Sequence, residues 1–267
     1  MRDARRRREI KDYYLGISAD EITSYLTPAS FDLWKSVARN RRELGLGTRW
    51  LEVGGGMGDL AAAALDRGYD VLMTDVQPEL LETAAARHPR LRGRLQRSDV
   101  FDPQDLAALA ARGPFPIVAA LGAVLNHARD HRQLTLGFGH LVTLVQPGSL
   151  LIVDLMLSEM FPGRPATIWA DLLHVLPGFA DLAQLTRAWG LQVLEAHSLY
   201  HRYPATPTFD AEFDERMLRL FLRTAEPARP APVRAAPRGR PGPRRRAPSP
   251  SRDSAGARRA SRRRPRA

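Results

Sequence analysis

The chain has 267 residues, 44% of them hydrophobic, a formal net charge of +11 and no cysteine. Without cysteine, disulfide bonds and thiolate metal sites are excluded. No apolar run approaches the roughly 18 residues of a membrane span. The basic N-terminus also lacks a hydrophobic signal core, so we expect a soluble cytoplasmic protein with no membrane partner.

The positive charge is concentrated at the two ends of the chain. Residues 226–267 contain fourteen Arg, nine Pro and only two acidic residues. Such a segment cannot bury enough apolar surface to fold, so we predict a disordered tail there. The preceding residues hold 26 basic and 27 acidic side chains. An enzyme that acts on nucleic acid more often carries a basic face on its fold, so we do not expect the folded body to bind nucleic acid.

Two helical patterns precede the first strand. Residues 18–26 open with a capping-box signature, and Thr27 followed by Pro28 marks a second helix start. The apolar residues of the second helix share one face: Phe31, Trp34 and Ala38. We therefore predict an N-terminal helical cap over residues 1–45.

From residue 46 to residue 225, strand and helix patterns alternate. The predicted strands cover about 49–53, 69–75, 94–99, 114–122, 147–156, 191–200 and 217–225. The predicted helices begin at or near Pro78, Pro103, Asp130 and Asp181. Repeated strand–helix units indicate one α/β domain, in which a doubly wound, mostly parallel sheet of seven strands carries helices on both faces.

Four glycines occupy five positions, 54–58, directly after the first strand. In a doubly wound sheet this turn faces the ligand crevice, where glycine lets the backbone approach a ligand closely. A dinucleotide site has the pattern G-x-G-x-x-G, which would place Gly or Ala where this chain has Asp59. The spacing that fits is acid-x-G-x-G-x-G, formed by Glu52, Gly54, Gly56 and Gly58.

In this motif the chain resembles the class I S-adenosylmethionine-dependent methyltransferases. The resemblance continues at Asp75, which lies 21 residues beyond Gly54, and in the segment "SDVF" at 98–101. It also includes "ALGAVLNHARD" at 120–130 and "LVQPGSLLIVD" at 144–154, so it covers about residues 49–155. The resemblance implies a Rossmann-like fold and S-adenosylmethionine as the cofactor.

The resemblance also implies roles for individual residues. In such enzymes the counterpart of Asp75 hydrogen-bonds both ribose hydroxyls, that of Asp99 meets the adenine amino group, and that of Val100 supplies a backbone donor. The cofactor is a sulfonium cation with an ammonium group and no phosphate, so an acidic lining such as Glu52 suits it. The full expected cofactor set is Glu52, Gly54, Gly56, Gly58, Asp75, Val76, Asp99, Val100 and Leu121.

Fewer residues are candidates for methyl transfer than for cofactor binding. His127 follows the fourth strand, near the expected methyl group, and is our candidate general base, although a structural role is the alternative. Asn126 could bind the acceptor or cap the turn. Tyr14 and Trp169 could line the acceptor pocket or pack in the core. Asp154 alone does not make a metal site, so we predict no metal.

We therefore expect methyl transfer from S-adenosylmethionine to a small-molecule acceptor, for which specialised metabolism is one setting. One alternative is an RNA or protein methyltransferase guided by the basic tail. Another is a regulatory protein that binds the cofactor without catalysis.

Overall fold

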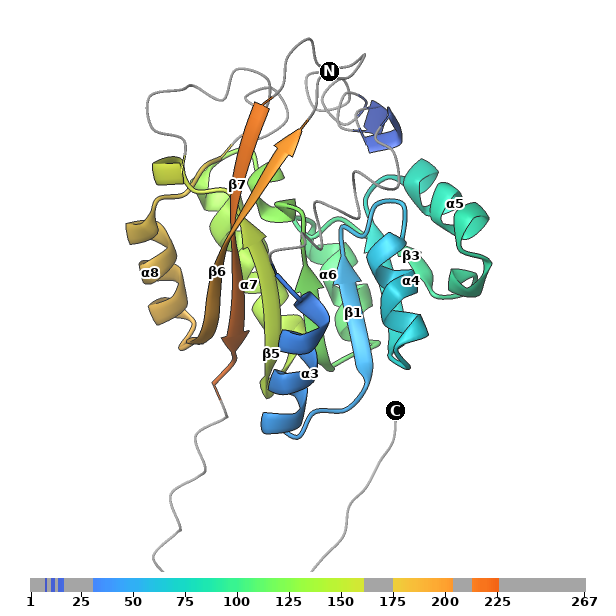
Figure 1. The fold of residues 1–267 in the computed structure, drawn as a ribbon, viewed down its shortest axis with the longest axis horizontal. Coiled ribbons are helices and arrows are strands. Elements are labelled where there is room, and N and C mark those ends of the chain that lie inside the picture. Colours follow the sequence, from blue (N-terminus) through green and yellow to red (C-terminus); the bar gives the residue numbers. More distant parts are fainter. Residues whose placement is uncertain are drawn as a thin grey trace, which may run out of the picture. The chain divides into compact units, whose positions relative to one another are not determined.

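A seven-stranded sheet, in the order β3-β2-β1-β4-β5-β7-β6, forms the framework of the protein in a computed structural model (Figure 1). The structure describes residues 8, 11, 12, 14–16, 31–160, 175–203 and 213–225. The helix predicted over 18–26 and the predicted tail, 226–267, lie outside these residues. The predicted domain boundaries therefore remain predictions.

The helices and strands follow the predicted alternation. The strands are β1 (Arg49–Val53), β2 (Asp70–Asp75), β3 (Leu95–Arg97), β4 (Phe115–Ala120), β5 (Val145–Leu155), β6 (Gln192–Tyr203) and β7 (Phe213–Arg223). The α-helices are α3 (Leu33–Glu43), α4 (Asp59–Asp66), α5 (Pro78–Arg87), α6 (Pro103–Ala110), α7 (His131–Leu144) and α8 (Phe179–Ala188). Short 3-10 helices are η1 (Pro89–Leu91), η2 (Val124–His127) and η3 (Ser158–Met160).

The strand pairing confirms the doubly wound, mostly parallel sheet. Strands β1 to β5 pair in parallel, whereas β7 lies antiparallel between β5 and β6. The chain leaves β1 toward β2 and β3 on one side, and β4 and β5 lie on the other. Ligands of such sheets bind beside this reversal, at the carboxyl ends of the strands.

Each face of the sheet carries its own apolar core. On one face, Leu33 of α3 and Leu60 of α4 join Trp50 and Ile117 of the sheet. On the other face, α6, α7 and α8 contribute the buried side chains Leu109, Phe138, Leu141, Leu182 and Leu185. The predicted covering of both faces by helices is confirmed. Among the residues that the structure describes, no helix is long and apolar enough to cross a membrane.

Local capping explains the helices that the sequence located best. The Asp102 side chain accepts a hydrogen bond from the Gln104 N–H, and α6 then begins at Pro103. Asp130 caps α7 in the same way through the Gln133 N–H. These caps satisfy backbone N–H groups that have no partner within the helix.

Helix α3 differs from its prediction. Phe31 and Asp32 are not helical, and α3 is capped by the Asp32 side chain, which accepts a hydrogen bond from the Lys35 N–H. Thr27–Pro28 is therefore not the cap of α3. The predicted apolar face was also wrong at Ala38, which is exposed. The buried residues of the helix are Leu33, Ser36, Val37 and Asn40.

Candidate active site

The glycine-rich loop lies between β1 and α4, at the carboxyl edge of the sheet. Gly54, Gly56 and Gly58 all have positive φ, at 69°, 55° and 85°, a region that glycine enters without steric cost. A Cβ built on Gly54 would lie 2.6 Å from the Val124 side chain, and one on Gly58 would lie 2.8 Å from that of Leu91. Glycine at these two positions therefore leaves room for neighbouring side chains of the protein.

Gly56 differs from the other two glycines. A Cβ built there meets no atom within 4 Å. Its N–H donates a hydrogen bond of 2.9 Å to Oδ2 of Asp75, at the end of β2. The loop is thus tied to the neighbouring strand while one side of Gly56 stays open, so this position can border a ligand.

Asp75 is buried, with 6% of its surface exposed. Its Oδ1 accepts a hydrogen bond of 2.9 Å from the Gln77 N–H, which shapes the turn before α5. Burial raises the pKa of Asp75, while the backbone N–H groups of Gln77, Gly56 and Val76 oppose that rise. Val76 itself is half-buried beside this turn.

Glu52 lies on β1, and only 3% of its surface is exposed. Its Oε2 is buried and accepts no hydrogen bond from the described residues. Burial, followed by the negative charges of Asp59 and Asp75, raises the pKa of Glu52 to about 8. An acid with such a pKa is mostly protonated at neutral pH.

Among the described residues, only one carboxylate oxygen of Asp59, at the start of α4, has hydrogen-bond partners. Its Oδ1 accepts hydrogen bonds from Nη2 of Arg87 at 3.0 Å and from Nε2 of His88 at 3.2 Å. Its Oδ2 is buried and has no partner among the described residues. Asp59 therefore fixes the start of α4 against α5.

The "SDVF" segment forms a tight turn after β3. Oδ1 of Asp99 accepts a hydrogen bond of 2.9 Å from the Phe101 N–H, and Nδ1 of His140 donates one of 2.7 Å to the Val100 carbonyl. Phe101 packs against Gly137 of α7, where any Cβ would come within 2.6 Å of its ring. Ser98 is buried, and its hydroxyl has no partner among the described residues. Contacts from α7 thus hold this turn in place.

The loop after β4 brings the candidate base to the same edge. Leu121 is 5% exposed, and His127 is half-buried in η2. Nε2 of His127 lies 3.3 Å from the Tyr14 hydroxyl, and the two rings meet edge to face with centroids 6.2 Å apart. The Lys11 ammonium lies 3.4 Å from the Glu79 carboxylate on α5. Residues 11 and 14 thereby contact α5, which follows β2, and the loop that follows β4.

The acceptor contact predicted for Asn126 needs correction. Asn126 has no exposed surface. Its Nδ2 donates to the carbonyls of Met156 and Val175 at 2.9 and 2.8 Å, and its Oδ1 accepts from the Met156 N–H at 3.0 Å. We therefore assign it a structural role in joining three chain segments. Trp169, the other predicted acceptor residue, lies outside the described residues.

A buried ion pair that the sequence analysis missed lies on the next strands of the sheet. Asp154 of β5 and Arg219 of β7 face each other in the strand register, and both have 0% of their surface exposed. Asp154 also accepts a hydrogen bond of 3.0 Å from the Gly122 N–H, in the loop that leads to His127. An arginine inside the apolar strand "MLRLFLR" was the available signal, since a buried charge needs a partner.

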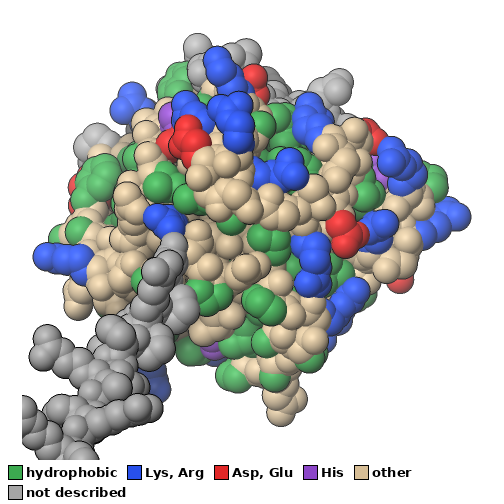
Figure 2. Space-filling model, turned by 90° about the horizontal axis from the view of Figure 1, so that it is seen from below, with side chains coloured by type: hydrophobic (Ala, Val, Ile, Leu, Met, Phe, Trp, Pro, Cys, Tyr) green, Lys and Arg blue, Asp and Glu red, His purple; other side chains and the backbone are tan. Residues whose placement is uncertain are grey.

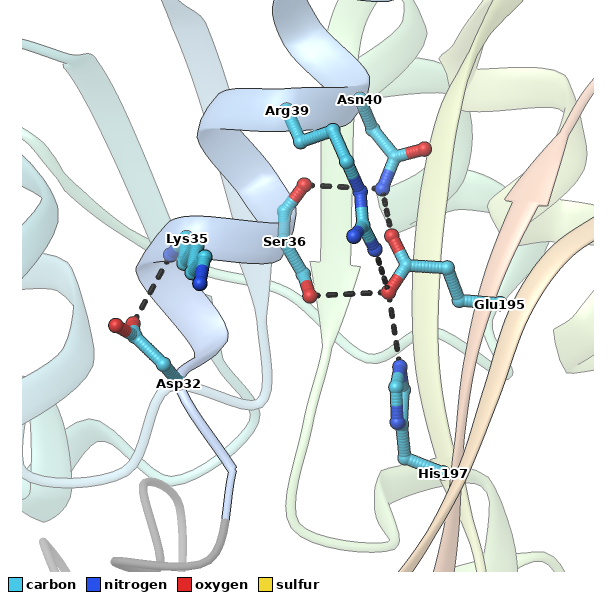
Figure 3. Close-up of polar contacts among 7 residues, drawn as sticks. All are labelled: Asp32, Lys35, Ser36, Arg39, Asn40, Glu195 and His197. Atoms are coloured by element: carbon cyan, nitrogen blue, oxygen red, sulfur yellow. Dashed lines mark hydrogen bonds and ion pairs between the residues drawn. The ribbon is translucent and has the colours of Figure 1, made fainter.

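A second missed cluster joins α3 to β6 (Figure 3). Glu195 of β6 accepts hydrogen bonds from Ser36 Oγ at 2.9 Å, from His197 Nε2 at 2.8 Å and from Asn40, and it pairs with Arg39 at 2.5 Å. Burial alone would raise the pKa of Glu195, but the bonds from Arg39, His197, Asn40 and Ser36 lower it to about 2. The polar face of α3 is thereby fixed to the sheet.

The charges of the described surface are interspersed. Viewed from below, Lys and Arg side chains are scattered among apolar and neutral groups (Figure 2). Arginines at the surface are paired with acids, Arg90 with Asp66, Arg94 with Asp70 and Arg97 with Asp105. Within the described part of the chain, no group of three or more His, Cys, Asp or Glu residues could hold a metal ion.

Comparison with known proteins identifies the central region. Residues 51–151 match a family model described as a methyltransferase domain. The comparison with curated protein sequences gave no match. The match begins in β1 and ends in β5, so it includes the glycine-rich loop, the end of β2 and the loop after β4.

Solved structures share the fold at low sequence identity. The N-methyltransferase NodS from Bradyrhizobium japonicum WM9, in complex with S-adenosyl-L-homocysteine, is 16% identical, with a TM-score of 0.55 over 82% of this chain and 98% of that one. An S-adenosylmethionine-dependent methyltransferase from Clostridium acetobutylicum ATCC 824 is 14% identical, with a TM-score of 0.53 over 76% and 96% of the two chains. A structure from work on echinomycin biosynthesis is 20% identical, with a TM-score of 0.51 over 72% and 81%.

Proposed function

Because the chain belongs to the class I S-adenosylmethionine-dependent methyltransferases, we propose that it methylates a small-molecule acceptor in the cytoplasm. The observation that supports the cofactor site most directly is the open side of Gly56, whose N–H donates a hydrogen bond to the buried Asp75. The choice of a small acceptor is supported by the near-neutral balance of residues 1–225, 26 basic against 27 acidic.

The residues around Gly56 suit the cofactor chemically. We assign Asp75 to the ribose hydroxyls, with Val76 beside it, and Glu52 to the ammonium group of the methionine arm. We assign Asp99 and Val100 to the adenine, and Leu121 to the wall of the site. The buried Ser98 hydroxyl and Glu52 Oε2, which have no partners among the described residues, support this assignment, because buried polar groups are normally hydrogen-bonded.

The bound cofactor supplies an electrophilic methyl group on a positively charged sulfur. The protein must then orient the acceptor and remove its proton as the new bond forms. We assign the proton transfer to His127, whose ring is half-buried in η2. The Tyr14 hydroxyl, 3.3 Å from Nε2, would fix the orientation of that ring. Trp169 remains a proposed residue of the acceptor pocket.

A screen of acceptors with methyl-labelled cofactor tests this proposal. The full chain and a chain ending at residue 225 should both label the same small molecule, at rates that change little with salt. An RNA or protein substrate held by the basic tail would instead require residues 226–267, and its binding would weaken steeply with salt. Binding of S-adenosylhomocysteine with no labelling across small-molecule, RNA and protein acceptors would favour the non-catalytic alternative.

A further inference from the structure

The carboxyl group of Glu52 is an unusual feature of the floor of the cofactor site. It points to the face of the sheet covered by α3, α4 and α5, since Trp50, two residues before it on β1, lies in that core. Only 3% of Glu52 is exposed, and Oε2 has no hydrogen-bond partner among the described residues. A buried and unpartnered carboxyl oxygen requires an explanation, because nearly all buried polar groups in native proteins are hydrogen-bonded.

The charged groups around Glu52 are mostly negative. Asp59 faces it from α4 and Asp75 from β2, and both raise its pKa. Arg87, the last residue of α5, and His88, which follows it, both contact Asp59. On α3, Arg39 pairs with Glu195. Because no cation among the described residues pairs with it, the Glu52 carboxyl is more stable as the protonated acid.

We propose that Glu52 binds the cofactor by exchanging its proton for the ammonium group of the methionine arm. In the free protein Glu52 is a neutral acid. When the ammonium group arrives, the O–H bond breaks, the proton leaves to solvent, and the carboxylate pairs with the ammonium ion. Charge and atoms balance, because one proton is released for each cofactor bound. This step deepens the proposed function, since it rests on the same cofactor site.

The exchange makes cofactor affinity depend on pH. Below the pKa of about 8 that burial gives Glu52, the affinity should increase about tenfold per pH unit, because binding releases about one proton. We assign Asp75 to the ribose, whose hydroxyls bring no positive charge to Glu52, so a ligand without the methionine arm should show no such dependence. The amino-acid contact can therefore be separated from the adenosine contacts with two ligands.

Calorimetry on the full chain tests the exchange. S-adenosylhomocysteine carries the methionine-derived arm without the sulfonium charge, and 5′-methylthioadenosine keeps the adenosine and the thioether but lacks the amino acid. Titrations between pH 6.0 and 7.5, in buffers of different ionisation enthalpy, give the number of protons released. We expect about one proton for S-adenosylhomocysteine and none for 5′-methylthioadenosine.

Two variants serve as matched controls. Glu52→Gln should abolish proton release and flatten the pH dependence for S-adenosylhomocysteine. Asp75→Asn should weaken both ligands and still release protons with S-adenosylhomocysteine alone, in a smaller number because one of the charges that raises the pKa of Glu52 is removed. No release from the wild-type protein, or equal release with both ligands, would overturn the exchange while leaving the cofactor assignment intact. If the folded protein bound neither ligand, the cofactor site itself, and this inference with it, would be wrong.

Discussion

The Arg219 guanidinium and the Asp154 carboxylate form a two-point ion pair inside the sheet. Nε donates to Oδ1 at 2.8 Å and Nη2 donates to Oδ2 at 2.7 Å. The Gly122 N–H donates to the same carboxylate, so the pair connects β5 and β7 with the loop that carries His127. The guanidinium also lies 5.7 Å from the centre of the Phe31 ring, just before α3.

We expect Arg219→Met to lower the free energy of unfolding by about 3–5 kcal/mol, because Asp154 would stay buried without its partner. Urea denaturation measures this loss. The double variant Asp154→Leu/Arg219→Met should recover much of it, since no charge is then buried unpaired. A single variant as stable as the wild type would show that the ion pair is not needed to hold these strands together.

A second prediction concerns the Glu195 cluster at low pH. Because its pKa falls from an ordinary 4.5 to about 2 in the folded protein, its stabilising effect is present above pH 4.5 and is lost as the pH falls toward 2. Glu195→Gln should therefore cost about 1–3 kcal/mol at pH 7 and much less at pH 2.5. Chemical denaturation at the two pH values measures the difference. Glu82→Gln, at an exposed position of α5, should change little at either pH.

The contribution of Glu52 to stability should depend on pH in the opposite sense. Its pKa is raised from 4.5 to about 8 in the folded protein, so its contribution to stability is fully present below pH 4.5 and is lost as the pH rises through 8. Without ligand, Glu52→Gln should therefore be more stable than the wild type by about 2–4 kcal/mol at pH 8.5, and nearly equal to it at pH 4.5. Equal stability at pH 8.5 would argue that Glu52 ionises freely.

Substitutions of the loop glycines should separate effects on stability from effects on ligand binding. Gly56→Ala places its Cβ in open space, so the positive φ should cost only about 1 kcal/mol of stability, whereas S-adenosylhomocysteine should bind much more weakly. Gly54→Ala must displace Val124 and should be the less stable of the two variants. Thermal melting and calorimetry measure both effects. Unchanged ligand binding by Gly56→Ala would remove Gly56 from the cofactor site.

The His127 assignment can be tested once an acceptor is known. If His127 removes the proton, His127→Gln should lower kcat by about 10²–10⁴-fold, with little effect on S-adenosylhomocysteine affinity. Tyr14→Phe keeps the edge-to-face ring contact and loses only the hydroxyl. It should shift the pH profile of kcat and lower kcat less than His127→Gln does. A His127→Gln enzyme with full kcat would leave His127 a structural role only.

The sequence predicted the elements whose causes are local. Asp102 followed by Pro103 contains nearly everything that starts α6, so that helix begins where it was expected. The buried face of α3 could not be predicted in this way, because Ser36 and Asn40 are buried only where Glu195, 155 residues from Asn40, accepts their hydrogen bonds.

In the candidate site, too, some features follow from the local sequence and others depend on residues far along the chain. The motif spacing located the loop glycines, and their positive φ is a backbone property that the loop itself requires. The occupation of the space beside Gly54 by Val124, however, depends on a loop 70 positions further along the chain. Likewise, Asn126 looked available because the carbonyls that it binds belong to Met156 and Val175.

The position of β7 has a consequence for the order of folding during synthesis. Strands β5 and β6 do not pair with each other, since β7 lies between them and pairs with both. Until the ribosome has made residues through Arg223, the edge of β5 therefore remains without its partner strand, and Asp154 lacks its arginine. The nascent chain must keep an open sheet edge and an unpaired carboxylate from aggregating until its last strand arrives.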